Sequence, residues 1–272
     1  MKEVVKKAPV GEDGHQDEPV VKLRNVDRMG GFAKGLAVIE AFGSGRPTQT
    51  IAEVARLSGL DRASARRCLL TLVECGYARK DGTYFELTPR ILRLAQSYLS
   101  MPLPRLVQPY LNQVADELYE SCSAAVLDGT EIIYIARAVH HRMIAAALHA
   151  GSRMPAYCTS MGRVLLAQLP PEQSREILEQ SERRALTKKT LTDVGDLMAE
   201  LTKVRENGYS IVDGEIESNA RSIAVPIFNA SGQAVAAFTV GLHSASADLK
   251  RMRNEILPCL LKVQSQLATI LS

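Results

Sequence analysis

Arginine side chains cluster at Arg62, Arg66 and Arg67, within a short stretch of the first third of the chain. A guanidinium group can donate two parallel hydrogen bonds to guanine O6 and N7, and it can also neutralise a phosphate. Residues four apart share one face of a helix, so a helix here would present Arg62 and Arg66 together. These residue types point to contacts with nucleic acid. The candidate DNA-binding residues are Arg62, Ser64, Arg66, Arg67, Arg79 and Lys80.

The distribution of charge along the chain favours the same chemistry. The net charge is +3, and residues 28–100 contain eleven Lys and Arg against six Asp and Glu, a balance of +5. The net charge is −1 for residues 1–27 and also −1 for residues 101–272. A positive excess confined to one small segment is expected when one module meets nucleic acid and the rest of the chain does not. A solvated basic surface is the alternative, and charge alone does not separate the two.

The elements that must position these residues form a winged helix-turn-helix. Thr50 and Glu53 have the spacing of a capping box, and the Asp81-Gly82 pair is a favoured hairpin turn. The apolar residues of the third helix lie opposite its arginines, so this helix can enter the major groove of DNA. The predicted elements are helices over 32–42, 51–57 and 61–75 and strands over 77–80 and 83–87.

An α+β domain is predicted after this module. Thr88-Pro89 begins a helix over 90–100, and Pro102 and Pro104 end it. Neighbouring strands joined by short turns are typical of an antiparallel sheet with helices packed on it. Strands are predicted over 124–127, 131–137, 143–148, 209–212, 222–228 and 234–241, and helices over 106–119, 161–168, 171–180, 194–207 (capped by Thr192) and 247–271. The predicted organisation is a flexible tail (1–27), a winged-helix DNA-binding domain (28–87), a linker helix and hinge (88–104) and a C-terminal domain (105–272).

Other functional classes find little support in the sequence. The longest apolar run has nine residues, 234–242, whereas a membrane helix needs about 20. Five cysteines without C-x-x-C spacing argue against a disulfide framework and a zinc cluster, and favour a reducing cytoplasm. Cys158 and a histidine would be the obvious nucleophile pair. No Gly-x-Ser-x-Gly elbow, glycine-rich phosphate loop or H-E-x-x-H motif accompanies them, so we expect no catalysis, no cofactor and no metal.

Over residues 28–272 the sequence resembles the IclR family of bacterial transcription regulators. The similar stretches are FAKGLAVIEAF, the run from Thr50 to Leu87, TPRILRLA, RMPAYCTSMGRVLLA and YSIVDGEIESNARSIAVPIFNASG. The motif YCTSMG at 157–162 is most similar to the corresponding sequence in the branch of the family that regulates protocatechuate, β-ketoadipate and 4-hydroxybenzoate catabolism. This chain has Asn219-Ala220 where the family commonly has Gly-Leu. The resemblance implies a winged helix, a linker helix that contributes to dimerisation, and a GAF-like domain that binds a small effector.

By the same resemblance, three segments line the effector pocket: the start of the helix at 160–162, the region from Asp213 to Ser222, and the last strand. The apolar side chain of Leu148 would line it as well. The implied effector-binding residues are Leu148, Ser160, Met161, Gly162, Asp213, Ser222, Thr239 and Gly241. If a helix begins at Met161, the amides of its first turn could hold a carboxylate. Structural alternatives stay open: the serines could satisfy backbone groups, and Asp213 and Glu215 could brace the turn with Arg221. The basic run over 137–142 could face an anionic effector or form a solvated hairpin.

Together these features predict a DNA-binding transcriptional regulator controlled by a small aromatic acid or its ring-cleavage product. Its partners would be a partly palindromic double-stranded operator, the organic-acid effector, and copies of itself in a homodimer or a dimer of dimers. RNA polymerase would be a partner only of an activator, and nothing in the sequence marks a surface for it. Two alternatives remain: an effector that is an unrelated small carboxylate, and a sensor that acts through a protein partner.

Overall fold

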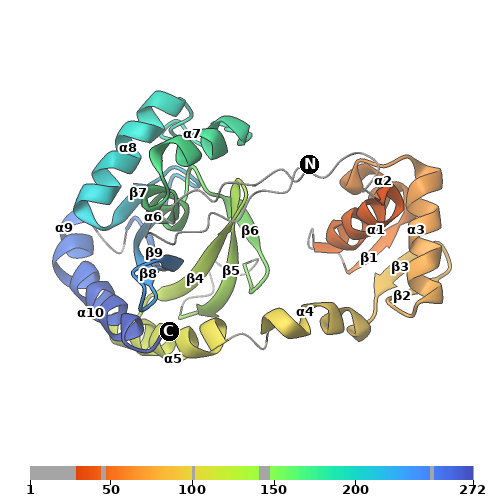
Figure 1. The fold of residues 1–272 in the computed structure, drawn as a ribbon, viewed down its shortest axis with the longest axis horizontal. Coiled ribbons are helices and arrows are strands. Elements are labelled where there is room, and N and C mark those ends of the chain that lie inside the picture. Colours follow the sequence, from red (N-terminus) through yellow and green to blue (C-terminus); the bar gives the residue numbers. More distant parts are fainter. Residues whose placement is uncertain (1–28, 44–46, 100–101, 141–147, 246–247, 272) are drawn as a thin grey trace, which may run out of the picture. The chain divides into compact units, whose positions relative to one another are not determined.

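The computed structural model of the chain describes residues 29–43, 47–99, 102–140, 148–245 and 248–271. The chain divides into two compact units between Thr88 and Pro89 (Figure 1). The first unit carries the arginine cluster, and the second carries the α+β sheet. The predicted tail over 1–27 and most of the predicted strand over 143–148 lie outside the described residues.

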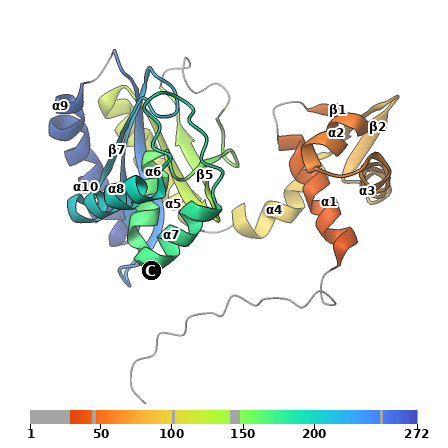
Figure 2. The ribbon, with the colours of Figure 1, turned by 90° about the horizontal axis from the view of Figure 1, so that it is seen from above.

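The first unit is a three-helix module with a small antiparallel sheet (Figure 2). The side chains of Val54, Leu69 and Phe85 are at most 1% exposed and lie in one apolar core shared by the helices and the sheet. Strand β1 was not predicted, because three residues are too few to show an alternating pattern; it pairs with β3. The elements are α1 (Gly30–Glu40), β1 (Thr48–Thr50), α2 (Ile51–Ser58), α3 (Arg62–Glu74), β2 (Ala78–Asp81) and β3 (Tyr84–Leu87).

Local capping signals set the ends of the two central helices. The Glu53 carboxylate accepts the Thr50 amide at 2.8 Å, and the Glu53 amide donates to Thr50 Oγ1 at 3.4 Å, which confirms the capping box. Gly59 follows α2 with a φ of 66°, a conformation that glycine adopts without a steric penalty. Asp61 then caps α3 by accepting the Ser64 amide at 2.8 Å. Each such cap contributes about 1 kcal/mol, so the turn between α2 and α3 is set locally.

The second unit is built on a six-stranded antiparallel sheet with the order β6-β5-β4-β9-β8-β7. This topology confirms the α+β class. Gly129 and Gly232, with φ values of 58° and 78°, make the left-handed turns of the β4–β5 and β8–β9 hairpins. The strands are β4 (Ser121–Asp128), β5 (Glu131–Ala138), β6 (Arg153–Pro155), β7 (Ser210–Asp213), β8 (Ala220–Phe228) and β9 (Ala234–His243).

Helices cover both faces of this sheet (Figure 1). Helices α5 (Pro102–Leu118) and α10 (Leu257–Ala268) pack on one face, where Leu111, Phe238 and Leu260 are fully buried. Helix α6 packs on the other face, and α8 contacts α6 and α7. The remaining helices are α4 (Leu92–Leu99), α6 (Ser160–Gln168), α7 (Pro171–Gln180), α8 (Val194–Asn207) and α9 (Leu249–Arg251). None of the described helices is long and apolar enough to cross a membrane.

Several predicted helix boundaries need correction, and most involve proline. Helix α5 begins at Pro102, because a proline in the first turn lacks only an amide that has no partner there anyway. Pro109 therefore lies inside α5. The last predicted helix is interrupted by a π-helical turn over Met252–Ile256, just before Pro258, which has no amide to donate four residues back. Asp193 caps α8 in place of Thr192, since its carboxylate accepts the Asp196 amide at 3.0 Å.

Candidate functional site

Three of the predicted arginines lie on one solvent-facing side of α3. Arg62, Arg66 and Arg67 are exposed, whereas Ala65 and Leu69 are fully buried in the apolar core of the unit. Burial of these apolar side chains fixes the rotation of the helix about its axis. Helix α3 therefore presents three guanidinium groups on a rigid element, as contacts to bases and phosphates require.

Ser64 does not belong to this exposed face, which corrects its prediction as a DNA contact. Only 3% of its surface is exposed. Its hydroxyl oxygen accepts from Lys34 Nζ and from Arg67 Nη2, each at 3.4 Å. Ser64 thus joins α1 to α3 through its buried hydroxyl group. Sequence reasoning missed Lys34, because an exposed lysine on an amphipathic helix carries no signal of its own.

The β2–β3 hairpin places Arg79 and Lys80 on its exposed surface, as predicted for a wing. Arg79 lies opposite Glu86 in the strand register and forms an ion pair with it, with Nη2 at 2.8 Å and Nε at 3.1 Å from the same carboxylate oxygen. Part of the charge of Arg79 is therefore neutralised within the hairpin. Lys80, opposite Phe85, is the exposed cation closer to the turn.

Three hydroxyl groups of the predicted effector pocket meet between the start of α6 and strands β8 and β9. Ser160 Oγ donates to Ser222 Oγ at 2.8 Å and lies 3.3 Å from Thr239 Oγ1. Thr239 also donates to the carbonyl oxygen of Ile223 at 2.8 Å. Ser160 and Thr239 are buried, and Ser222 is partly exposed. We call Ser160, Ser222 and Thr239 the hydroxyl cluster.

The other predicted pocket residues flank this cluster in different ways. Gly241 lies opposite Ser222 in the β8–β9 register, on the cluster side of the sheet. Met161 is buried in the apolar core. Leu148 is half-buried, and its carbonyl oxygen accepts from Arg137 Nη1 at 2.5 Å.

Gly162 is required by packing, and its amide is already bonded. A Cβ atom at this position would lie 2.2 Å from the carbonyl oxygen of Ala156, so only glycine fits. The helix begins at Ser160, and the Gly162 amide donates to Thr159 Oγ1 at 3.0 Å. This amide is therefore not free to hold a carboxylate, which corrects that part of the prediction.

Asp213 lies on the wrong face of the sheet for an effector contact. It accepts from Arg221 Nε at 2.6 Å and from Lys189 Nζ at 2.8 Å, and Arg221 is its register partner. Because side chains alternate along a strand, Asp213 and Arg221 point away from the face that carries Ser222. The hydrogen bonds from Lys189 and Arg221 hold the pKa of this carboxyl below its ordinary value. Asp213 is a structural residue, as the alternative allowed.

Glu215 is also structural, but its partner is Arg163 and not Arg221. Two parallel hydrogen bonds of 2.6 Å join the guanidinium to the carboxylate. The Arg163 side chain is 2% exposed and that of Glu215 is 8% exposed. Arg163 also donates to the Tyr157 carbonyl, and the Leu191 amide donates to Glu215. The only sequence signal for this pair was an arginine within an apolar helical run.

Arg137 is a partly buried cation on the cluster side of the sheet. It lies opposite Ser123, which lies opposite Thr239, and directly opposed residues share a face. Its guanidinium carbon lies 5.5 Å from the centre of the Tyr134 ring. Its Nε atom is buried and has no hydrogen-bond partner within the part of the chain that the structure describes. Burial lowers the pKa of this guanidinium.

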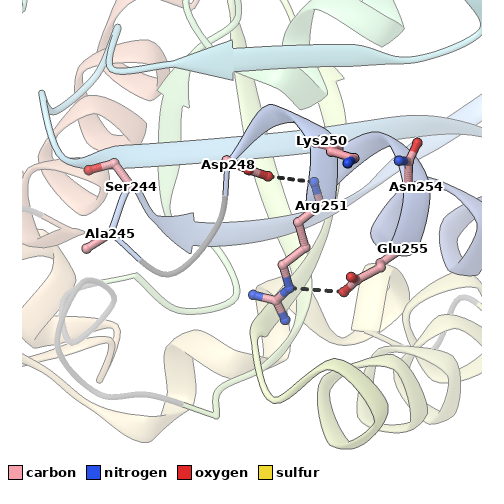
Figure 3. Close-up of a pocket in the computed structure, with 7 residues that line it drawn as sticks. All are labelled: Ser244, Ala245, Asp248, Lys250, Arg251, Asn254 and Glu255. Carbon is pink, nitrogen blue, oxygen red and sulfur yellow. Dashed lines mark hydrogen bonds and ion pairs between the residues drawn. The ribbon is translucent and has the colours of Figure 1, made fainter.

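Two surface depressions lie away from the hydroxyl cluster. One of about 590 Å³ borders the start of α9, and Figure 3 shows Arg251 beside Glu255 within it. The other, of about 330 Å³, lies along α7 and Met198. Neither is lined by a predicted effector residue. Among the described residues, no group of three or more His, Cys, Asp or Glu side chains could hold a metal ion.

Comparisons with known proteins match both units of the chain. The model of the IclR helix-turn-helix domain matches residues 32–82, and the model of the bacterial transcriptional regulator IclR C-terminal domain matches residues 95–269. The first match contains α3 with its exposed arginines, and the second contains the hydroxyl cluster and Arg137.

Individual relatives extend over most of the chain. The Pca regulon regulatory protein of Pseudomonas putida is 43% identical over 89% of this chain and 84% of its own length. The p-hydroxybenzoate hydroxylase transcriptional activator of Acinetobacter baylyi is 35% identical over 92% of this chain and 94% of its own. An IclR homologue of Microbacterium hydrocarbonoxydans, solved in complex with 4-hydroxybenzoate, has a TM-score of 0.74 at 27% identity, covering 88% of this chain and 98% of that one. The exposed arginine helix and the α+β sheet are thus those of a DNA-binding regulator, and this chain belongs to the IclR family of bacterial transcriptional regulators.

Proposed function

We propose that α3 reads an operator in the major groove through Arg62, Arg66 and Arg67, while Lys80 contacts the backbone of the same duplex. The observation that supports this is the exposure of three guanidinium groups on a helix that Ala65 and Leu69 anchor in the apolar core. Arg66 lies one turn into the helix, where recognition helices reach base edges, and Lys80 is a cation on the wing.

Replacing Arg66 by Ala should weaken operator binding by about 1–3 kcal/mol, roughly 5- to 150-fold, because a bidentate base contact is lost. Fluorescence anisotropy on operator and random duplexes measures the change. The operator should lose more affinity than the random duplex. Arg175→Ala, which removes an exposed arginine of α7, is the matched control. An equal loss on both duplexes would reduce Arg66 to a phosphate contact.

We propose that the hydroxyl cluster and Arg137 form the two ends of a site for a small aromatic acid. Thr239 and Arg137 lie on one face of the sheet, two strands apart, a separation of about 9.6 Å between backbones. Arg137 is a half-buried cation without a carboxylate partner among the described residues, which favours an anionic group next to it. A benzene ring with a carboxylate at one end and a hydroxyl at the other matches this arrangement.

The relatives support the same class of effector. The similar structure from Microbacterium hydrocarbonoxydans holds 4-hydroxybenzoate, and a double mutant of the inducer-binding domain of an Acinetobacter regulator, 29% identical to this chain, holds 3-hydroxybenzoic acid. Calorimetric titration with protocatechuate, 4-hydroxybenzoate and β-ketoadipate, one at a time, tests the proposal. We expect saturable binding of one of them, near one per subunit. No heat from any of the three, with the protein folded, would point to an unrelated small carboxylate.

Replacing Ser222 by Ala should weaken binding of the aromatic acid by about 0.5–1.5 kcal/mol, roughly 2- to 12-fold, because one hydrogen bond is lost. The Ser222 hydroxyl is the partly exposed member of the cluster, so its removal leaves the fold intact. Calorimetry with whichever acid binds gives the dissociation constant. Ser231→Ala, in the exposed β8–β9 turn, should leave it unchanged; equal effects of the two substitutions would remove Ser222 from the site.

We propose that the protein acts as a homo-oligomer. Apolar side chains on α4 and at the start of α1 are more than half exposed, and a second copy of the chain would cover them: Met29, Phe32, Leu92 and Leu94. Sedimentation equilibrium should give a dimer or a tetramer, and a monomer at micromolar concentration would contradict this. The homodimer is also the form that a partly palindromic operator matches.

We propose that the protein works by binding and not by covalent catalysis. Cys158, the nucleophile considered from the sequence, is fully buried. Burial raises the pKa of its thiol to about 11, so little thiolate is present at neutral pH. The proposed mechanism needs only that the effector binds two arrangements of the DNA-binding units with different affinities.

A further inference from the structure

We propose that Lys34 on α1 is a DNA-phosphate contact of the same interface as α3; this rests on the proposed operator binding by α3. Lys34 is exposed, and its Nζ atom lies 3.4 Å from Ser64 Oγ, at the start of α3. Helices α1 and α3 share the apolar core of the first unit, where Val38, Ala65 and Leu69 are fully buried. The ammonium group is therefore brought to the beginning of the helix that carries the arginines.

The Ser64 hydroxyl explains why Lys34 stays there. A hydroxyl has one hydrogen to donate and two lone pairs that accept. The Ser64 hydroxyl oxygen accepts from both Lys34 Nζ and Arg67 Nη2. One buried hydroxyl thus holds two cations from different helices side by side. An ammonium and a guanidinium group held together in this way can share one phosphate.

The charges around the start of α3 leave a positive excess for a phosphate. Lys34, Arg62 and Arg67 bring three positive charges, and Asp61 brings one negative charge. The hydrogen bonds from Ser64 and the nearby charge of Lys34 hold the pKa of Asp61 below its ordinary value, so this carboxyl is ionised at neutral pH. Its oxygen accepts the Ser64 amide, so a phosphate would be bound by the side chains and not by that amide.

The salt dependence of duplex binding tests this assignment. A protein that loses one phosphate contact releases fewer counterions when it binds DNA. The slope of log K against log salt, which is negative, then becomes less steep by about 0.9. We expect this change for Lys34→Gln on operator and random duplexes alike, so the affinity ratio of wild type to variant should shrink about 3.5-fold between 50 and 200 mM salt. Lys34→Arg keeps the charge and should restore the wild-type slope. Lys188→Gln removes an exposed lysine of the second unit and is the matched control.

The possible outcomes separate this inference from the proposed function beneath it. Lys34 is not a phosphate contact if wild type binds the operator and the Lys34→Gln variant shows the same salt dependence of duplex binding as the control variant Lys188→Gln. If wild type binds no duplex with a salt-dependent affinity, the proposed operator binding by α3 is itself wrong, whatever the role of Lys34. Circular dichroism of each variant shows whether the first unit is folded, and retained helicity is expected because Lys34 is exposed.

Discussion

Replacing Glu215 by Ala should destabilise the second unit by about 3–5 kcal/mol, because the Arg163 guanidinium would remain buried without its counter-charge. Arg163 also ties α6 to the Tyr157 carbonyl, and Glu215 ties the turn after β7 to Leu191. Loss of the carboxylate therefore loosens the attachment of α6 to the turn after β7, and of that turn to the segment around Leu191. For a unit of this size, the midpoint of thermal unfolding should fall by about 6–20 °C. Differential scanning calorimetry resolves this transition from that of the first unit.

Two variants show whether burial of the charge causes the loss. Asp213→Ala breaks two partly exposed ion pairs, two residues away, and should cost about 1 kcal/mol or less for each of them. The double variant Arg163→Met/Glu215→Leu removes both charges and should recover most of the stability, since apolar side chains of similar volume replace a buried pair. If Glu215→Ala lowers the midpoint no more than Asp213→Ala does, the buried pair is not what holds these loops.

The first unit could be predicted almost completely, because its signals are local. Thr50 and Glu53 are three residues apart, and Asp61 is three residues before the amide that it caps, so both caps are visible in the sequence. Ser64 shows where residue type misled the prediction. It lies four residues before Cys68 and eight before Leu72, on the inner stripe of α3, and its helical position outweighed its polarity.

The second unit depends on contacts that the sequence does not display. Ser160 and Thr239 are 79 residues apart, and Arg163 and Glu215 are 52 apart. The resemblance to a family led to the first pair, while the second had only an arginine within an apolar helical run as its signal. The acidic turn shows the same limit: the sequence indicated ion pairs there, but strand register decides that Arg221 faces Asp213. Strand register also places Arg137 on the cluster side of the sheet. From the sequence alone, the basic run that begins at Arg137 could have faced an effector or formed a solvated hairpin.

Replacing Arg137 by Gln should weaken binding of 4-hydroxybenzoate by about 2–5 kcal/mol, a loss of roughly 30-fold or more, because the effector carboxylate would lose its only proposed counter-charge. Glutamine keeps an amide that can donate to the Leu148 carbonyl, so the local backbone contact is preserved. Calorimetry gives the dissociation constant, and anisotropy on an operator duplex without effector should be unchanged. Arg153→Gln, an exposed arginine on β6 paired with Asp128 and Glu131, is the matched control and should bind normally.

A neutral analogue separates the charge of Arg137 from its shape. Wild type should bind 4-hydroxybenzyl alcohol much more weakly than 4-hydroxybenzoate, because the alcohol presents no anion to the guanidinium. In Arg137→Gln this preference should almost vanish, while the hydroxyl cluster still contacts the phenol end of both ligands. A variant that retains the wild-type preference for the acid would show that another group binds the carboxylate. In that case the half-buried guanidinium beside Tyr134 would serve only to hold the chain at Leu148.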